Sequence, residues 1–288
     1  MKNERASIEE IRGFFARLIT AASRSSDPRL ERAFEAVPRE AFFPPGPWKV
    51  KVNHRYIDTP SADPIYLYQN ALVVLDADKG INNGEPALHA AWIGAVAPQR
   101  GEAVTHIGAG MGYYTAILSM LVLPTGTVSA FEIDESLAEK ARLNLEPFDG
   151  TNVSSADATL KRLPKSDVIY VNAGVAAPPA DWLRALKPGG RMIFPWRPSE
   201  EVALTILVQA ERGRFNVTPL MPAWFIPCVG ASREVTASKT PASFTEARTT
   251  RSIWRTTDRL PDQSAIAIYP DVWFSSESAA PTALKSGK

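Results

Sequence analysis

The stretch Val104-Thr-His-Ile-Gly-Ala-Gly-Met-Gly-Tyr113 decides how this sequence folds. Its first four residues have the length of a buried strand, and the apolar segment 113–123 is long enough for a helix. Between them stand Gly108, Gly110 and Gly112, which let the backbone turn sharply and approach a ligand that a Cβ would obstruct. The stretch therefore predicts a strand that ends at a ligand site and passes directly into a helix.

Short apolar runs alternate with helical segments farther along the chain. Strands are expected at 128–132, 152–155, 168–172 and 191–195, and helices at 136–145 and 181–186. This order is typical of a doubly wound, mostly parallel α/β sheet with helices on both faces, a Rossmann-like fold. The runs 202–209 and 214–219, on either side of Glu211-Arg212-Gly213, predict a hairpin that closes one edge of the sheet.

The segments that flank this core have a different character. Helical spacing predicts helices over 5–23, where Ser7 and Glu10 form a capping box, over 27–38 and over 87–97. Residues 42–64 are expected to form an irregular connection, 71–76 a short strand, and 78–86 a turn-rich loop. Residues 231–262 are polar with room for one helix, 265–269 could form a strand, and 275–288 are expected to be disordered.

Two carboxylates follow predicted strands. Glu132 ends the strand after the glycines, and Asp157 follows the next strand. Ligands of open α/β sheets bind beyond the carboxyl ends of the strands, where both side chains fall. A carboxylate at residue 132 can accept hydrogen bonds from both ribose hydroxyls of an adenosine-containing cofactor, and Asp157 could take the adenine amino group.

The glycine spacing separates the possible cofactors. The dinucleotide pattern G-x-G-x-x-G requires a small residue where Tyr113 stands, which argues against a nucleotide-dependent oxidoreductase. The G-x-G-x-G form that ends in an aromatic residue is used by enzymes that bind S-adenosylmethionine (SAM). The cofactor-binding residues expected from the sequence are Ile107, Gly108, Gly110, Gly112, Glu132, Ile133, Asp157 and Ala158, and no metal ligands are assigned.

Several segments, in this order, resemble the protein-L-isoaspartate O-methyltransferase family over roughly residues 30–230. The segments are Ala33-Phe-Glu-Ala-Val-Pro-Arg-Glu-Ala-Phe42, 106–113 with Phe131-Glu-Ile-Asp134, Leu186-Lys-Pro-Gly-Gly-Arg191 with Pro195, and Met221-Pro-Ala-Trp-Phe-Ile-Pro227 with Gly230. The resemblance implies a SAM-binding domain at 96–230, preceded by a helical and substrate-loop region (1–95) and followed by a partly disordered extension (231–288). It also implies methylation of isoaspartyl carboxylates, as in protein repair.

The family's acceptor loop, T-I-S-x-P, corresponds here to Asn82-Asn83-Gly84-Glu85-Pro86, with Gly84 in place of the serine. The resemblance therefore assigns the acceptor site to Asn83 and Gly84. It also implies that His89 touches SAM, since a histidine stands there in some members. Asn83 could replace the serine as a hydrogen-bond donor, Glu85 would repel an acceptor carboxylate unless it points away, and Gly84→Ser is expected to be tolerated.

Composition restricts the remaining possibilities. The net charge of +1 provides no strong field to recruit nucleic acid or a membrane surface. Cys228 is the single cysteine, so no internal disulfide can form. The longest apolar run is far shorter than a membrane span, and the charged start has no signal-peptide core. A cytoplasmic protein is therefore expected. Two alternatives to isoaspartyl methylation stay open, a different peptide or small-molecule acceptor and a SAM-binding protein without catalysis. The sequence does not indicate the oligomeric state.

Overall fold

The computed structural model describes residues 6–52 and 55–279, and its contacts divide the chain into two compact units. The first unit holds residues up to Val104 together with Gly108–Ala156, and the second holds Thr105–Ile107 and the chain from Asp157 onward. Strand β5 (Ala103–Ile107) therefore begins in one unit and ends in the other. The expected division at residues 95 and 230 stays a prediction.

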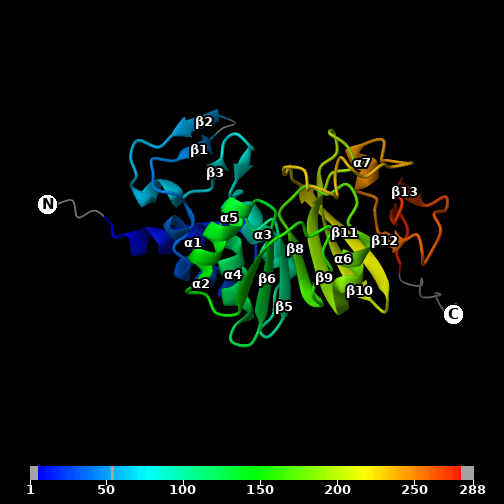
Figure 1. The fold of residues 1–288 in the computed structure, drawn as a ribbon, viewed down its shortest axis with the longest axis horizontal. Helices are drawn as coiled ribbons and strands as arrows, with labels where there is room; N and C mark the ends of the chain where they lie inside the picture. The colour runs from blue at the N-terminus through cyan, green and yellow to red at the C-terminus, as the bar shows by residue number, and fades with distance from the viewer. Residues whose placement is uncertain (1–5, 53–54, 280–288) are drawn as a thin grey trace, which may run out of the picture. The chain divides into compact units, whose positions relative to one another are not determined.

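The helices of the first unit match the sequence expectations closely (Figure 1). They are α1 (Ile8–Ser23), α2 (Pro28–Ala36), α3 (Pro86–Val96), α4 (Tyr113–Val122) and α5 (Glu135–Leu145), with 3-10 turns η1 (Arg39–Phe42) and η2 (Pro64–Leu67). The capping box at α1 is confirmed, because the backbone N–H of Glu10 donates to Ser7 Oγ at 3.2 Å and that of Ser7 donates to Glu10 Oε2 at 2.8 Å.

The region expected to be an irregular connection contains two strands, so that prediction was wrong. Strands β1 (Lys49–Val52), β2 (Arg55–Asp58), β3 (Leu72–Asp76) and β4 (Ile81–Asn82) form a small antiparallel sheet in the order β2-β1-β3-β4. Every residue of β2 is exposed, so its sequence shows no alternation to reveal a strand. The sheet packs over a small core of Phe43, Trp48, Val50, Leu67 and Val73.

A buried arginine ties this sheet region to the helices. Arg39 has no exposed surface, and its guanidinium donates to three main-chain carbonyls, those of Leu67 at 2.6 Å, Gln69 at 2.9 Å and Ala71 at 3.2 Å. The same group lies 5.7 Å from the ring centre of Phe15 and 5.8 Å from that of Tyr113. The Val-Pro-Arg-Glu motif thus has a structural role in this chain.

Strand β6 (Thr127–Glu132) carries Glu132 at its carboxyl end and pairs in parallel with β7 (Thr151–Ser155). Helix α5 packs against both strands, and α4 packs against β6. These elements bring the turn at Gly108–Gly112 next to the end of β6, where the backbone N–H of Gly108 donates to the carbonyl of Phe131 at 2.9 Å.

The second unit is a mostly antiparallel sheet in the order β13-β14-β12-β11-β10-β9-β8. Its elements are β8 (Ser166–Val171), α6 (Ala180–Ala185), β9 (Leu186–Trp196), β10 (Leu204–Glu211), β11 (Arg214–Pro222), α7 (Phe244–Ala247), β12 (Ser252–Arg255), β13 (Ala265–Ile268) and β14 (Val272–Ser275). Strands β8 and β9 are parallel, and the hairpin β10–β11 turns at Arg212 and Gly213, which both have positive φ.

Two sequence expectations for this unit were wrong. The hairpin does not close the sheet, because β12 pairs with β11 and is followed by β14 and β13. Residues 275–279 are ordered rather than disordered, since Ser252 Oγ donates to the carbonyl of Glu277 at 2.6 Å and the N–H of Ala279 donates to Asn216 Oδ1 at 3.1 Å. The same expectation for 280–288 lies outside the described residues.

Of the helices within residues 6–52 and 55–279, none combines the length and the apolar character that a membrane crossing requires.

Candidate active site

The three glycines turn the chain as their spacing predicts, but they have different neighbours. All three have positive φ, 76° at Gly108, 56° at Gly110 and 95° at Gly112. A Cβ on Gly112 would lie 3.0 Å from Leu145 of α5, a tight approach that adds to the strain of its positive φ. A Cβ on Gly110 would come no nearer than 3.5 Å to Leu75, its one neighbour within 4 Å. Gly110 therefore has the open surface that a bound ligand needs.

Glu132 is held by the glycine turn itself. Its side chain is buried, with 7% exposed, and its two oxygens accept from different backbone N–H groups. Oε2 accepts from Gly110 at 2.7 Å, and Oε1 accepts from Asp134 at 3.0 Å. Burial raises the pKa of this carboxyl, although the backbone hydrogen bonds act in the opposite direction. A carboxylate fixed in this way keeps further lone pairs for the hydroxyls of a ribose.

The β3–β4 hairpin approaches the glycine turn at one place and the start of α5 at another. Leu75 of β3 is the neighbour of Gly110, and Lys79, at the hairpin tip, forms an ion pair with Asp134. Asp134 also accepts from the N–H of Leu137 at 3.0 Å and so caps α5. The pKa of Asp134 is lowered, first by the hydrogen bond from Lys79 and then by that from Leu137. The hairpin leads directly into the predicted acceptor loop.

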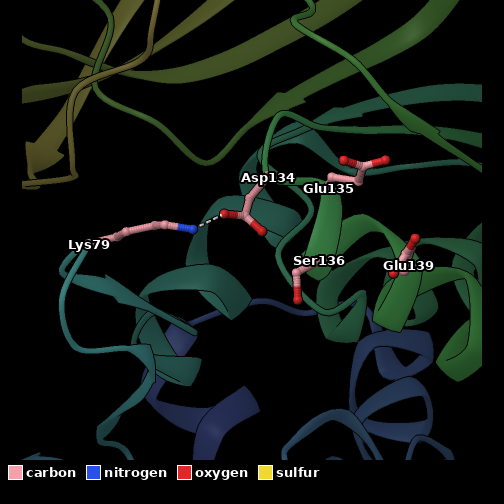
Figure 2. A pocket seen from close by; sticks show the side chains of 5 residues that line it. All are labelled: Lys79, Asp134, Glu135, Ser136 and Glu139. Carbon is pink, nitrogen blue, oxygen red and sulfur yellow. Dashed lines mark hydrogen bonds and ion pairs between the residues drawn. The ribbon is translucent and has the colours of Figure 1, made fainter.

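A pocket of about 540 Å³ surrounds this ion pair (Figure 2). It is lined by Lys79, Asp134, Glu135, Ser136 and Glu139. The lining carries more negative than positive charge, and the Lys79 side chain is 57% exposed. This pocket does not include Glu132 or the glycines.

The acceptor loop leaves one buried donor without a partner. The backbone N–H of Asn83 donates to the carbonyl of Val73 at 2.9 Å, and that of Gly84 donates to Asn82 Oδ1 at 2.9 Å. The Asn83 side chain is 8% exposed, and its Nδ2 has no hydrogen-bond partner within the described part of the chain. A buried donor of this kind costs free energy unless a ligand or water satisfies it. Glu85, the next residue, is exposed.

His89 lies in α3 with 1% of its surface exposed, and it connects the loop 82–86 to the start of α4. Its ring stacks on Tyr114, at a centroid distance of 3.8 Å and an interplanar angle of 16°. Tyr114 belongs to the first turn of α4, two residues after Gly112. His89, with Gly84 beside it, is thus brought to the start of α4, next to the glycine turn, within one unit.

The expectation that Gly84→Ser would be tolerated is wrong. Gly84 has a φ of 71°, where side chains are strained, and a Cβ there would lie 2.2 Å from His89 Nε2. The sequence could not reveal this collision, because a side chain at residue 84 meets His89 only when α3 packs back against the loop.

The other predicted cofactor residues lie elsewhere. Ile133 follows Glu132 in the first unit and is 50% exposed. Ile107, Asp157 and Ala158 belong to the second unit. There, Asp157 Oδ1 accepts from the N–H and the hydroxyl of Thr159 at 2.8 and 2.7 Å, and the carbonyl of Ala158 accepts from Trp182 Nε1 at 3.0 Å. Their roles in cofactor binding stay predictions.

Sequence reasoning did not identify Lys79, Asp134 or Tyr114. Asp134 had a usable signal, because an aspartate before a helical segment is a common cap. Lys79 had none, since its partner is 55 residues away. Tyr114 lies in an apolar helical segment and looks like ordinary core.

Comparison with solved structures defines the class of fold. The structure matches one named "protein-L-isoaspartate O-methyltransferase" with a TM-score of 0.67 and 19% identity, over 91% of this chain and 86% of the other. A Plasmodium falciparum structure of the same family name, solved with S-adenosyl-L-homocysteine, matches with a TM-score of 0.60 and 16% identity, over 75% of this chain and 97% of the other. These matches confirm the expected α/β, Rossmann-like methyltransferase fold.

Sequence comparison then defines the family. The profile of "Protein-L-isoaspartate(D-aspartate) O-methyltransferase (PCMT)" matches residues 15–233, so the chain belongs to this family. Relatives that bear the name protein-L-isoaspartate O-methyltransferase include one from Pelotomaculum thermopropionicum, 32% identical over 62% of this chain and 76% of its own length. One from Pelobacter propionicus, with the suffix 2, is 32% identical over 71% of this chain and 84% of its own length. The chain is accordingly a SAM-dependent methyltransferase.

Proposed function

We propose that this enzyme transfers the methyl group of SAM to the free carboxylate of an isoaspartyl residue in a peptide or protein. Family membership supports the reaction, and the unpartnered amide of Asn83 is the observation that carries the assignment to this loop. The amide is buried at the end of the hairpin that contacts the cofactor turn through Leu75. An acceptor carboxylate at this place would satisfy it.

The residues present fit the cofactor. Gly110 offers a surface without a side chain, and Glu132 offers a buried, fixed carboxylate for the ribose hydroxyls. We assign the cofactor site to these residues with Gly108, Gly112, Ile133 and His89. The cofactor roles expected of Ile107, Asp157 and Ala158, which belong to the second unit, stay predictions from the sequence. When bound, SAM supplies a methyl group on a positively charged sulfur, which a carboxylate can attack.

The protein's task in this reaction is alignment. A carboxylic acid with a pKa of about 4 is ionised at neutral pH and needs no general base. Fixing two reactants in line can contribute roughly 7–11 kcal/mol to the lowering of the barrier. Asn83 Nδ2 would donate to one acceptor oxygen and orient the other. The first two residues of α3 offer the acceptor no free backbone donor, since Pro86 has no N–H and that of Ala87 donates to Asn70 Oδ1 at 2.9 Å.

The test is methylation of an isoaspartyl peptide with radiolabelled SAM, with the matching aspartyl peptide as substrate control. We expect a methyl ester that base releases as methanol. Asn83→Ala should reduce turnover more than it reduces binding of S-adenosylhomocysteine, because its hydrogen bond serves the acceptor. Asn152→Ala, which removes an exposed asparagine of β7, is the matched control variant. Absence of any base-labile product would contradict the proposal.

A different acceptor is a second candidate, because Gly84 carries no hydroxyl and His89 occupies the adjacent space. A base-stable methyl product on a small molecule or another protein group would support it. Binding of S-adenosylhomocysteine without turnover on any acceptor would support a protein that has lost catalysis. We retain a cytoplasmic location, and the lack of nucleic-acid and membrane partners, as predictions from composition.

A further inference from the structure

The small sheet of the first unit ends in an open edge. Its strands lie in the order β2-β1-β3-β4, so β2 hydrogen-bonds to β1 on one side (Figure 1). On the other side, no strand from the described part of the chain pairs with it. Every residue of β2 is exposed. An uncovered edge of this kind presents main-chain donors and acceptors with which an extended chain can pair.

The register of the β1–β2 hairpin shows which main-chain groups face outward. The N–H of Thr59 donates to the carbonyl of Trp48 at 2.8 Å, so these two residues face each other as a hydrogen-bonded pair. Such pairs alternate along an antiparallel ladder, so Ile57 also directs its main-chain groups at β1. Tyr56 and Asp58 therefore direct their N–H and C=O groups away from β1. Each of them offers one donor and one acceptor on the open edge.

The hairpin carries an excess of positive charge beside this edge. Its two strands hold more basic than acidic residues, namely Lys49, Lys51 and Arg55 against Asp58. In the strand register Lys49 lies opposite Asp58, so these two charges offset each other. Lys51 lies opposite Tyr56 instead, with its ammonium 5.6 Å from the ring centre, and Arg55 is exposed at the start of β2. The remaining charge favours an anionic partner.

An uncovered apolar strip accompanies the open edge. Ile57 lies opposite Val50, which is buried in the small core, so its side chain is on the core face of the sheet. It is nevertheless 50% exposed, and Val52, on the same face, is 36% exposed. The core thus stops short of β2, and the side chains of an added strand would cover this strip.

The edge is aligned with the place proposed for the acceptor carboxylate. A row of residues crosses the sheet from Ile57 through Val50 to Val73. The carbonyl of Val73 accepts from the N–H of Asn83 at 2.9 Å, so Asn83 extends this row within the same unit. With strands about 4.8 Å apart, a strand added beside β2 would lie roughly 19 Å from Asn83. About six extended residues span that distance.

We propose that β2 binds the acceptor polypeptide by taking an extended, acidic segment of it as a further strand of the small sheet. The chemistry of an isoaspartyl residue favours this occupant. Its main chain runs through the side-chain carboxyl group, and the added methylene interrupts helices and strand ladders, so its neighbours have unpaired N–H and C=O groups. Acidic residues among them complement Lys51 and Arg55. This inference rests on the proposed function for the identity of the acceptor.

The length of the acceptor peptide tests the added strand. A peptide with two residues on each side of the isoaspartate is too short to reach β2, whereas an acidic extension of about ten residues reaches it. We expect the extension, on one side of the isoaspartate, to lower KM by about 5- to 50-fold. N-methylation of alternate residues in the extension should remove this gain, because a methylated amide cannot donate. An extended peptide no better than the short one, or an N-methylated peptide as good as the unmodified one, would overturn the proposal.

A charge-reversal variant locates the effect on the hairpin. Lys51→Glu/Arg55→Glu should raise KM for the acidic extended peptide by about 5- to 30-fold and leave that for the short peptide within about twofold. Arg17→Glu/Lys140→Glu, which reverses two exposed charges on helices of the same unit, is the matched control. Unchanged turnover of the short peptide shows that each variant is folded. An unchanged KM of the hairpin variant for the extended peptide would refute the role of the edge.

Binding without turnover separates this inference from the proposed function. In an NMR titration, the acidic extension without an isoaspartate should shift the amides of Tyr56 and Asp58 with a Kd of about 1 mM, and Lys51→Glu/Arg55→Glu should weaken it. If these shifts occur and the wild type methylates no isoaspartyl peptide, the proposed function fails and the strand edge stands. If methylation occurs without these shifts, only the strand edge is refuted. Equal shifts with a single-stranded RNA of the same charge would assign the hairpin to nucleic acid and overturn the proposal.

Discussion

Glu132 offers the sharpest test of the cofactor site. In Glu132→Ala, two hydrogen bonds from ribose hydroxyls to a charged acceptor are lost, each worth roughly 1.5–3 kcal/mol. The N–H groups of Gly110 and Asp134 also lose their acceptor, at 2.7 and 3.0 Å, so the turn is no longer fixed. We expect a loss of about 3 kcal/mol or more, which is about 150-fold in affinity. Glu132→Gln keeps one acceptor oxygen and should lose roughly tenfold.

The assay is calorimetric titration with S-adenosylhomocysteine. Glu146→Gln removes an exposed carboxylate at the end of α5 and serves as the matched control. Circular dichroism and melting temperature establish that each variant is folded. If folded Glu132→Ala binds within about twofold of the wild type, Glu132 does not hold the ribose, and the assignment built on its hydrogen bonds to the turn is incorrect.

Four further outcomes follow from the structure. Arg39→Ala should destabilise the protein by roughly 3 kcal/mol or more in denaturant titration, because three main-chain carbonyls, two of them in buried hydrogen bonds, lose their donor. Burial raises the pKa of Glu132, so the affinity for S-adenosylhomocysteine should fall as pH drops through a pKa above that of an ordinary glutamate, and Glu132→Gln should remove this pH dependence. The raised pKa has the opposite effect on the free energy of unfolding of the unliganded protein. There, the stabilising contribution of Glu132 should decline as pH rises through the same pKa. Lys79→Ala should change cofactor affinity by less than about threefold, and high salt should abolish the difference, since the lysine is exposed. Truncation after Phe274 should lower the melting temperature because it removes the buried Ser275, and a melting temperature equal to that of the full-length protein would contradict this expectation. Truncation after residue 279 tests separately whether residues 280–288 are dispensable.

Local patterns were enough to predict the elements around the glycine turn. The glycines, the apolar run before them and the capping residues of α1 and α2 each act over a few neighbouring residues, so their structural consequences can be read from the sequence. The same holds for Glu132, which ends the strand after the glycines, whereas Asn83 was assigned from the family resemblance. Only the folded structure shows that Glu132 and Asn83 are buried and which hydrogen bonds they make.

The features that were missed depend on strand pairing and side-chain packing, which local sequence patterns do not encode. Strands β2, β12 and β14 have four residues each, and cross-strand pairing rather than an alternating pattern defines them. The collision between Gly84 and His89 involves two residues whose separate readings, a flexible turn and a histidine on a helix, were reasonable. Only the return of α3 over the loop makes them mutually exclusive.

The position of β14 has a consequence for how the chain is made. This strand lies between β12 and β13 and hydrogen-bonds to both, although it follows both in the sequence. During synthesis, β12 can pair with β11 as soon as it emerges, but β13 has no partner strand in the sheet until residues 272–275 have left the ribosome. Until then, the outer side of β12 is an unpaired edge that another chain could join. A nascent chain whose synthesis stops before residue 272 would thus expose an unpaired strand edge that is prone to pair with other chains.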